Sequence, residues 1–442
     1  MPTAVGLDRE TLAAWYRRNR ERTLALFDIV RPESYEARPI PLRNPICFYE
    51  GHIPAFSVNT LLKRGLGDPG IDADLEVLFE RGIDPEDEGH VPSAASRWPS
   101  RIEIRSYAAA ADRAILDAVA NRDVESEDSP LLEGGLALYT ILEHEPMHQE
   151  TLTYMWHRLP YDQKVRPVSL APPTAGAEPP TPRSVWIPSG TASLGSDPRS
   201  APFAWDNERP PHSVEVEAFA MDVYSVTNRD YMEFVDSGGY SRRDLWDEGA
   251  WEGIAASSTR HPLFWELHRG AWFWRGFWDL IPLPMAWPVY VTHEEAQAYA
   301  RWKGRRLPTE AEFHRAAFGA PSGRERAHPW GDDPPEPAHG NFDFGSADPS
   351  PVGSYPRGQS AWGIHDLVGN GWEWTSTVFA PFPGFEPLPT YPQYSADFFD
   401  GKHFVLKGAS PSTPRELLRP GFRNWFRGNY PFVYSKFRLV NE

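Results

Sequence analysis

The chain has 442 residues, with 44 Lys or Arg against 61 Asp or Glu, and a net charge of −17. This acidic balance argues against a general binder of nucleic acid or of an anionic membrane surface. No run of about 18 apolar residues occurs, and the N-terminal segment lacks the pattern of a signal peptide. The single cysteine, Cys47, excludes an internal disulfide and a thiolate-rich metal cage. We therefore expect a cytoplasmic protein with no nucleic-acid or membrane partner.

The first half of the chain has the apolar pattern of packed helices. Helical spacing is clear over residues 7–27 and 101–119. Residues 61–64 and 75–81 add two short helical stretches between them. A further helix is predicted over 129–159, because Ser129 is a good N-cap and Pro130 suits the first helical position. The pattern predicts a four-helix bundle.

The second half has a different character. Residues 184–195 and 213–224 alternate in the manner of short strands, and residues 293–303 and 310–318 are predicted helices. Beyond Phe318 the chain is rich in Gly, Pro, Asn and Trp and has no long periodic segment. We predict an α+β domain with few regular elements.

A Pro- and Ala-rich stretch, residues 167–183, separates the halves and is typical of a semi-rigid linker. The predicted organisation is a helical metal-binding domain at 1–166, this linker, and a second domain at 184–442.

The run His144-Glu145-Pro146-Met147-His148 is an H-E-x-x-H pattern on a predicted helix. Residues four apart share a helix face, so both imidazoles can reach one ion. Zinc proteases use this pattern with the Glu as general base. Pro146 within the motif and the bundle around it argue against a protease. Two histidines making ordinary hydrogen bonds would give the same pattern.

A third candidate ligand is His52, which we expect on a loop between helices, next to Gly51 and close to Pro54. With His144 and His148 it would form a three-histidine set that leaves positions open on an octahedral ion. Nitrogen ligands without a thiolate suit Fe(II), Zn(II) or Cu(II), and the residues alone do not choose among these metals.

The second half closely resembles the formylglycine-generating (sulfatase-modifying, C-type-lectin-like) fold. The matching segments are Arg305 to Phe313 (RRLPTEAEF), Pro329-Trp330-Gly331, Gly363 to Trp374 (GIHDLVGNGWEW), Trp186 to Gly190 and Phe437 to Val440. Formylglycine-generating enzymes bind copper with a cysteine pair. Residues 184–442 contain no cysteine, so that chemistry is excluded here.

A DinB-like helical half with three histidines, joined to such a domain, resembles the ergothioneine sulfoxide synthases. Ovothiol-type synthases and selenoneine synthase are their relatives. The resemblance implies a nonheme Fe(II) oxidoreductase that uses O₂ to join sulfur or selenium to the imidazole carbon of hercynine (N-α-trimethylhistidine). His52, His144 and His148 match the iron-binding positions.

The resemblance also implies roles for other residues. Tyr391 and Tyr394 match a tyrosine pair of which the first is the catalytic proton donor. Asn424 and Trp425 match the stretch that holds hercynine, in a pocket expected at the junction of the two halves. Three further substrate-binding positions are Arg101, which matches a carboxylate-binding arginine, the nearby Tyr107, and Met147, which replaces a polar residue.

Two positions depart from the family pattern. Synthases that use γ-glutamylcysteine carry an Asp directly after the Asn-Trp pair and an Arg four residues later, where this chain has Phe426 and Tyr430. Losing both charge partners removes charge-assisted hydrogen bonds worth about 1.5–3 kcal/mol each. The two aromatic rings favour an uncharged selenosugar as the donor, and the alternative is γ-glutamylcysteine or cysteine. A non-catalytic DinB-like binding module is the alternative of another class.

Overall fold

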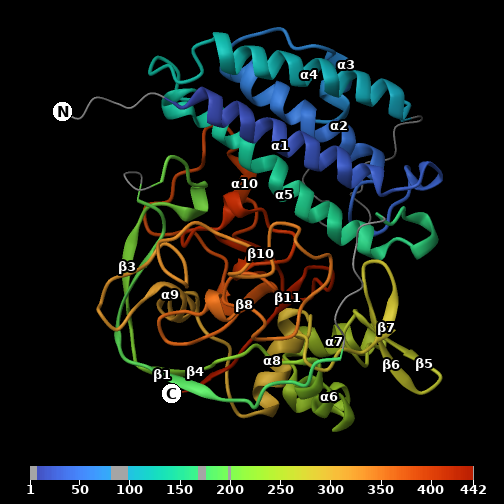
Figure 1. Ribbon diagram of the computed structural model, residues 1–442, viewed down its shortest axis with the longest axis vertical. Helices are drawn as coiled ribbons and strands as arrows, with labels where there is room; N and C mark the ends of the chain where they lie inside the picture. Colours follow the sequence, from blue (N-terminus) through green and yellow to red (C-terminus); the bar gives the residue numbers. More distant parts are fainter. Residues whose placement is uncertain (1–6, 81–97, 168–175, 198–200, 442) are drawn as a thin grey trace. The chain divides into compact units, whose positions relative to one another are not determined.

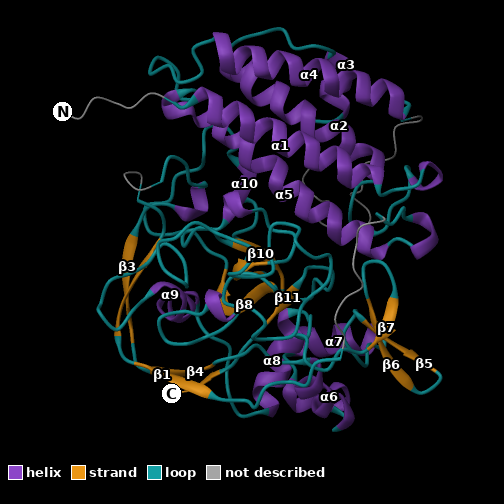
Figure 2. Cartoon of the chain, in the orientation of Figure 1, coloured by secondary structure: helices purple, strands orange, loops and turns teal. Residues whose placement is uncertain are grey.

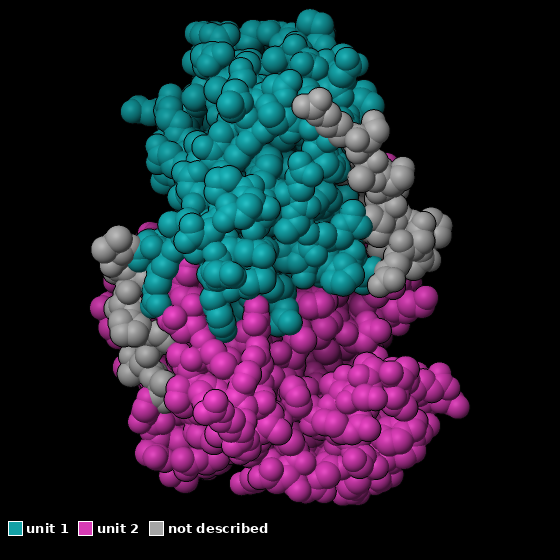
Figure 3. Space-filling model, turned by 90° about the vertical axis from the view of Figure 1, so that its right-hand side faces the viewer, with its two compact units in different colours: residues 1–170, 388–392 teal, residues 171–387, 393–442 magenta. Residues whose placement is uncertain are grey.

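The computed structural model describes residues 7–80, 98–167, 176–197 and 201–441. The chain divides into two compact units (Figure 3): residues 1–170 with 388–392 form unit 1, and residues 171–387 with 393–442 form unit 2. A helical first unit and a mixed second unit confirm the α+β prediction (Figure 2). Of the predicted linker, residues 168–175 lie outside the described residues, and 176–183 contain no helix or strand.

Unit 1 is built from long helices that run alongside one another (Figure 1). Its helices are α1 (Arg9–Asp28), α2 (Ile46–Ser57), the π-helical η2 (Val58–Gly65), α3 (Ala73–Leu78), α4 (Arg101–Asn121) and α5 (Leu136–Arg158), with short 3₁₀ turns at Pro32–Ser34, Glu133–Gly135 and Tyr161–Gln163. Both α1 and α2 pack on α4 and α5. Capping by Asp8 starts α1, and a capping box of Ser100 and Glu103 starts α4.

Two predictions in unit 1 differ from the structure: the start of one helix, and the loop at His52. The helix expected from Ser129 begins only at Leu136, because Gly134 and Gly135 adopt left-handed φ values of 60° and 77° that interrupt it. The loop expected at His52 is instead the helix α2. Every residue of α2 is buried, so the segment lacks an amphipathic period, and its Gly and Pro imitate a loop.

Unit 2 contains many short strands joined by long loops. Its strands are β1 (Ser184–Ile187), β2 (Gly190–Leu194), β3 (His212–Val216), β4 (Phe219–Asp222), β5 (Trp265–His268), β6 (Ala271–Arg275), β7 (Leu280–Pro282), β8 (Gly371–Val378), β9 (His403–Ala409), β10 (Asn424–Arg427), β11 (Ser435–Lys436) and β12 (Val440–Asn441). The helices are α6 (Asn228–Asp236), α7 (Glu248–Ser257), α8 (His293–Trp302), α9 (Glu310–Phe318) and α10 (Gln393–Ala396). Capping boxes open α6, α8 and α9.

The central sheet of unit 2 has the strand order β10–β9–β8–β11. The strands β8 and β9 pair antiparallel, whereas β11 joins β8 in parallel. Glu373 on β8 bonds Lys436 and Arg438, and all three side chains are fully buried. No long periodic segment was expected beyond Phe318, yet β8 and β9 lie there. Most of their residues are buried, so hydrophobic alternation is weak.

Candidate metal centre and substrate residues

Three imidazoles meet inside unit 1, one from α2 and two from α5. The Nε2 atom of His148 lies 3.2 Å from Nε2 of His52 and 3.0 Å from Nε2 of His144. The ligand atoms of all three lie within 4.8 Å of one another, so the group could hold a metal ion. Neighbouring ligands of an octahedral ion stand about 3.0 Å apart when metal–nitrogen bonds are about 2.1 Å. Both contacts of His148, with His52 and with His144, therefore have the spacing of adjacent ligands on such an ion.

The protonation of the imidazoles also suits metal binding. Burial lowers the pKa of His52 to about 4. Burial and the electrostatic influence of the other two imidazoles lower the pKa of His144. Burial and the electrostatic influence of His52 and Arg43 lower the pKa of His148. All three rings are therefore neutral near pH 7 and have a lone pair for a cation. The Nδ1 atom of His52 donates to the Phe79 carbonyl at 2.7 Å, which leaves its Nε2 as the ligand atom.

Pro146 lies inside α5 between the two histidines of the motif. Proline lacks the N–H that would bond the carbonyl of Leu142 four residues earlier. The side chain of Asn19 on α1 replaces that donor, with Nδ2 at 2.8 Å from the Leu142 oxygen. The helix therefore continues through the proline with its backbone satisfied.

The Glu145 side chain is bound within the core and is not available as a general base at the metal centre. Its Oε1 accepts hydrogen bonds from Arg20 Nη1 at 2.8 Å and from the Thr23 hydroxyl at 2.5 Å. Glu145 is 1% exposed, and burial raises its pKa despite these two partners. This geometry argues against the zinc-protease alternative.

Aromatic rings surround the three histidines. Phe48 stacks on His52, and Phe56 lies parallel to His144 with ring centroids 3.5 Å apart. The Tyr391 ring is 5.3 Å from the Phe56 ring and 6.2 Å from the His144 ring. Tyr391 belongs to the short segment 388–392 that packs in unit 1. The structure thus brings the predicted proton donor beside the histidines, although its role stays a prediction.

The residue before Tyr391 makes a buried hydrogen bond to α5. The hydroxyl of Thr390 lies 2.8 Å from that of Thr140, which is one helical turn before His144 on α5. Thr140 itself donates to the Leu136 carbonyl, so Thr390 is the donor in this pair. No local pattern indicates this contact, because its partners are 250 residues apart.

The guanidinium group of Arg101 contacts residues of α1 and α2. Its Nε donates to Glu50 Oε2 at 3.1 Å, its Nη2 donates to the Phe27 carbonyl at 2.9 Å, and its guanidinium lies over the Tyr35 ring. Arg105 Nε also bonds Glu50, at 2.9 Å. These contacts tie α4 to α1 and α2 and support a structural role for Arg101. Its predicted role in carboxylate binding stays a prediction.

The other predicted residues of unit 1 lie on the same helices. Tyr107 on α4 is buried, and its hydroxyl has no hydrogen-bond partner among the described residues. Burial raises its pKa. Met147 is half-buried on α5, between the two histidines of the motif.

The residues predicted to hold hercynine lie in unit 2 on β10. Trp425 stacks on Phe379 with centroids 4.4 Å apart, and Tyr394 meets its ring edge-on at 5.1 Å. Asn424 Oδ1 accepts the backbone N–H of Trp425 at 2.9 Å. Neighbouring side chains on a strand leave opposite faces, so Asn424 and Trp425 point to different sides of β10. The predicted tyrosine pair is also divided, with Tyr391 in unit 1 and Tyr394 in unit 2.

The two aromatic residues that replace the charged pair contact each other. The Phe426 and Tyr430 rings stack with centroids 4.9 Å apart and an angle of 18° between their planes. Both are partly exposed. The two stacked rings occupy the positions where the family pattern described above has an Asp and an Arg.

Arg423, directly before Asn424, anchors the start of β10. Its guanidinium bonds both oxygens of Glu310, at 2.9 and 3.1 Å, and it lies over the Phe382 ring at 4.1 Å. Both charged side chains are buried. Glu310 lies in the segment Arg305 to Phe313, and Arg423 directly precedes the predicted residues Asn424 and Trp425, but nothing in the sequence pairs Glu310 with Arg423.

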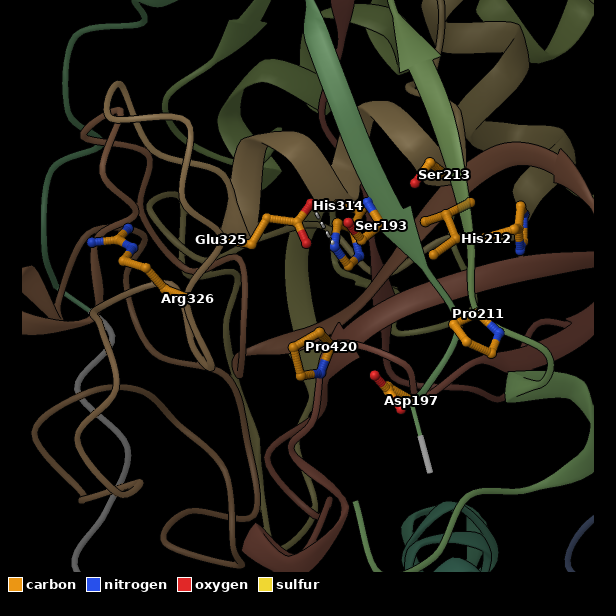
Figure 4. A pocket seen from close by; sticks show the side chains of 11 residues that line it. Ser193, Asp197, Pro211, His212, Ser213, His314, Glu325, Arg326 and Pro420 are labelled. Atoms are coloured by element: carbon orange, nitrogen blue, oxygen red, sulfur yellow. Dashed lines mark hydrogen bonds and ion pairs between the residues drawn. The ribbon is translucent and has the colours of Figure 1, made fainter. Parts of the chain in front are cut away.

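Unit 2 also contains cavities away from these residues. One of about 400 Å³ lies beside β2 and β3, where His314 Nε2 faces Glu325 Oε1 at 3.4 Å (Figure 4). Its lining contains none of the functional residues that the sequence predicted. A second cavity, of about 860 Å³, borders Glu310 and Arg423.

Comparisons with known proteins agree with the resemblance. Residues 170–442 match the family described as Sulfatase-modifying factor enzyme 1-like domain. The chain is 34% identical to the hercynine oxygenase of Mycolicibacterium thermoresistibile, with 95% of this chain and 92% of that protein covered. It is also 34% identical to the hercynine oxygenase of Mycobacterium tuberculosis, over 98% of both chains. Ergothioneine biosynthesis protein 1 of Neurospora crassa is 30% identical over 92% of this chain and 54% of its own length. With such identity along nearly the whole length, the chain belongs to the hercynine oxygenase family.

Proposed function

We propose that this protein is an O₂-dependent nonheme iron enzyme that joins a chalcogen donor to the imidazole carbon of hercynine. The observation that carries the proposal is the convergence of His52, His144 and His148 in a chain that resembles hercynine oxygenases throughout. Bound Fe(II) would supply the activation of O₂. The neutral imidazoles, their spacing and the absence of thiolates in the group suit this ion.

The remaining chemistry is assigned to residues of this chain. Tyr391 Oη is the proposed proton donor in the oxygen-dependent step, supported by its position beside His144. Asn424 is proposed to hydrogen-bond the hercynine imidazole, and Trp425 to face its trimethylammonium group. The two side chains leave opposite faces of β10, which is an edge strand of its sheet, so the proposed ligand would lie across that edge. The similarity to two hercynine oxygenases supports hercynine as the acceptor.

For the donor we propose an uncharged selenosugar. The stacked rings of Phe426 and Tyr430 support this choice, because neither can form a salt bridge with an amino acid end of a peptide thiol. The alternative is a thiol such as γ-glutamylcysteine or cysteine, which would make the enzyme an ergothioneine-type synthase. The relative named ergothioneine biosynthesis protein 1 supports that alternative.

Oxygen consumption that depends on hercynine tests the class of the protein. The protein reconstituted anaerobically with ferrous iron should consume O₂ with hercynine and a donor, and should form a C–Se or C–S product. A binding module would consume none with any substrate. Iron content should be largely lost in His148→Ala, and full iron stoichiometry in that variant would exclude the three-histidine site.

The donor is tested by side-by-side turnover. We expect 1-seleno-N-acetylglucosamine to react faster than cysteine or γ-glutamylcysteine, each offered with hercynine and O₂. A preference for γ-glutamylcysteine of about tenfold or more, equal to about 1.4 kcal/mol in the barrier, would overturn the argument from Phe426 and Tyr430.

None of the helices in the described part of the chain is both long and apolar enough to cross a lipid bilayer.

A further inference from the structure

The hydrogen-bond partner of His52 comes from the end of the short helix α3. The Nδ1 atom of His52 donates to the main-chain carbonyl of Phe79, the C-cap residue directly after α3. The Phe79 side chain is fully buried, and its ring lies 6.0 Å from that of Phe48 and 6.2 Å from that of Trp98. The carbonyl that fixes the His52 ring is therefore held in place by a packed aromatic side chain.

Gly51 makes room for that side chain. A Cβ atom at position 51 would lie 2.4 to 2.6 Å from three atoms of the Phe79 ring. Carbon atoms in contact stand about 3.5–4.0 Å apart, so any larger residue would displace the ring. Because the ring is enclosed, the displacement would move the Phe79 backbone away from His52.

The other anchor of α3 is Glu76, whose side chain is fully buried. It accepts hydrogen bonds from the backbone N–H groups of Ile71 at 2.7 Å and Asp72 at 3.1 Å, and from Lys63 Nζ at 3.0 Å. Burial opposes its ionisation, but these donors outweigh burial and hold its pKa below the ordinary value. Asn59 Nδ2 also bonds the Glu76 carbonyl. Lys63 and Asn59 lie on η2, which continues α2, the helix that carries His52.

We propose that α3 is a positioning element for the metal ligand His52, with Gly51 and Glu76 as positioning residues. The proposal rests on the metal site of the proposed function. A carbonyl partner at Nδ1 fixes both the tautomer and the direction of Nε2, and loss of such partners typically weakens metal binding roughly 10–100-fold. Glu76 touches none of the three histidines in the described structure, so an effect of its substitution on metal affinity would have to pass through α3.

The test is the affinity of the full, metal-free chain for Co(II), followed by the visible absorption of the bound ion. Gly51→Ala should weaken Co(II) binding roughly 10–100-fold and alter the spectrum, and Glu76→Gln should weaken it about tenfold. Adding Phe79→Leu to Gly51→Ala should restore much of the affinity, because the smaller side chain keeps the carbonyl and removes the clash. Asp112→Asn is the matched control, since Asp112 also pairs with a cation in unit 1, Arg20 on α1.

The result separates this inference from the proposed function. If the wild type binds Co(II) and His148→Ala does not, the metal site stands. Wild-type affinity in both Gly51→Ala and Glu76→Gln would then overturn the role of α3 alone. A wild type that binds Co(II) no better than His148→Ala would overturn both. If Gly51→Ala does not fold, as judged by circular dichroism, Glu76→Gln decides the question.

Discussion

At the scale of single residues, the Tyr391 hydroxyl carries the most specific chemical assignment. Tyr391→Phe keeps the ring that contacts Phe56 and His144 and removes only the proton donor. We expect C–Se or C–S coupling to fall roughly 10²–10⁴-fold, the range for loss of a general acid, while iron and hercynine binding persist. Product analysis alongside O₂ uptake should show oxygen diverted toward oxidation of the donor. Unchanged coupling would transfer the role to Tyr394 or Tyr107.

For Glu145 we predict an effect on stability and not on catalysis. Because its carboxylate pairs with buried Arg20, Glu145→Ala leaves that cation with Asp112 alone. We expect a loss of about 3 kcal/mol in the free energy of unfolding of unit 1, measured by urea denaturation of the metal-free chain. The control Glu21→Ala, at an exposed position on α1, should stay within about 0.5 kcal/mol of the wild type. Peptide hydrolysis that depends on Glu145 would contradict this assignment and favour a protease.

At the scale of elements, α5 depends on a donor from another helix. Asn19→Leu removes the Nδ2 that bonds Leu142, and the unpaired buried carbonyl should cost about 1–3 kcal/mol of stability. In a Pro146→Ala background the same substitution should cost less, because the N–H of residue 146 can then bond Leu142 within the helix. A double-mutant cycle on the metal-free chain measures this coupling. Additive effects would show that Asn19 does not compensate for the proline.

The elements also show what a single sequence can predict. Helices α1, α4, α8 and α9 were predicted because the helical spacing of their apolar residues is a local signal. The buried helix α2 and the buried strands β8 and β9 have no such period, and they were missed or misassigned. In the candidate site, His144 and His148 share a local motif. The Phe79 carbonyl leaves no signal at all, since every residue has a backbone carbonyl.

At the scale of the whole molecule, one short segment joins distant parts of the sequence in a single unit. Residues 388–392 lie far along the chain, between parts of unit 2, yet pack with residues 1–170. The N-terminal helices alone therefore lack Tyr391, the proposed proton donor. The hydrogen bond between Thr390 and Thr140 is a buried polar contact of this segment, and Thr390 is 1% exposed.

Thr390→Val tests the importance of that contact, because it removes the hydroxyl and keeps the side-chain shape. Thr140 would retain its own bond to Leu136, so α5 should be unaffected. We expect iron content to be unchanged and coupling to fall about tenfold, which corresponds to a loss of about 1.4 kcal/mol in positioning Tyr391. Oxygen uptake should continue and yield more oxidised donor. Thr390→Ser restores the donor and should recover coupling. If Thr390→Val couples as well as the wild type, the other contacts of Tyr391, including its packing against Phe56, would be sufficient to position it.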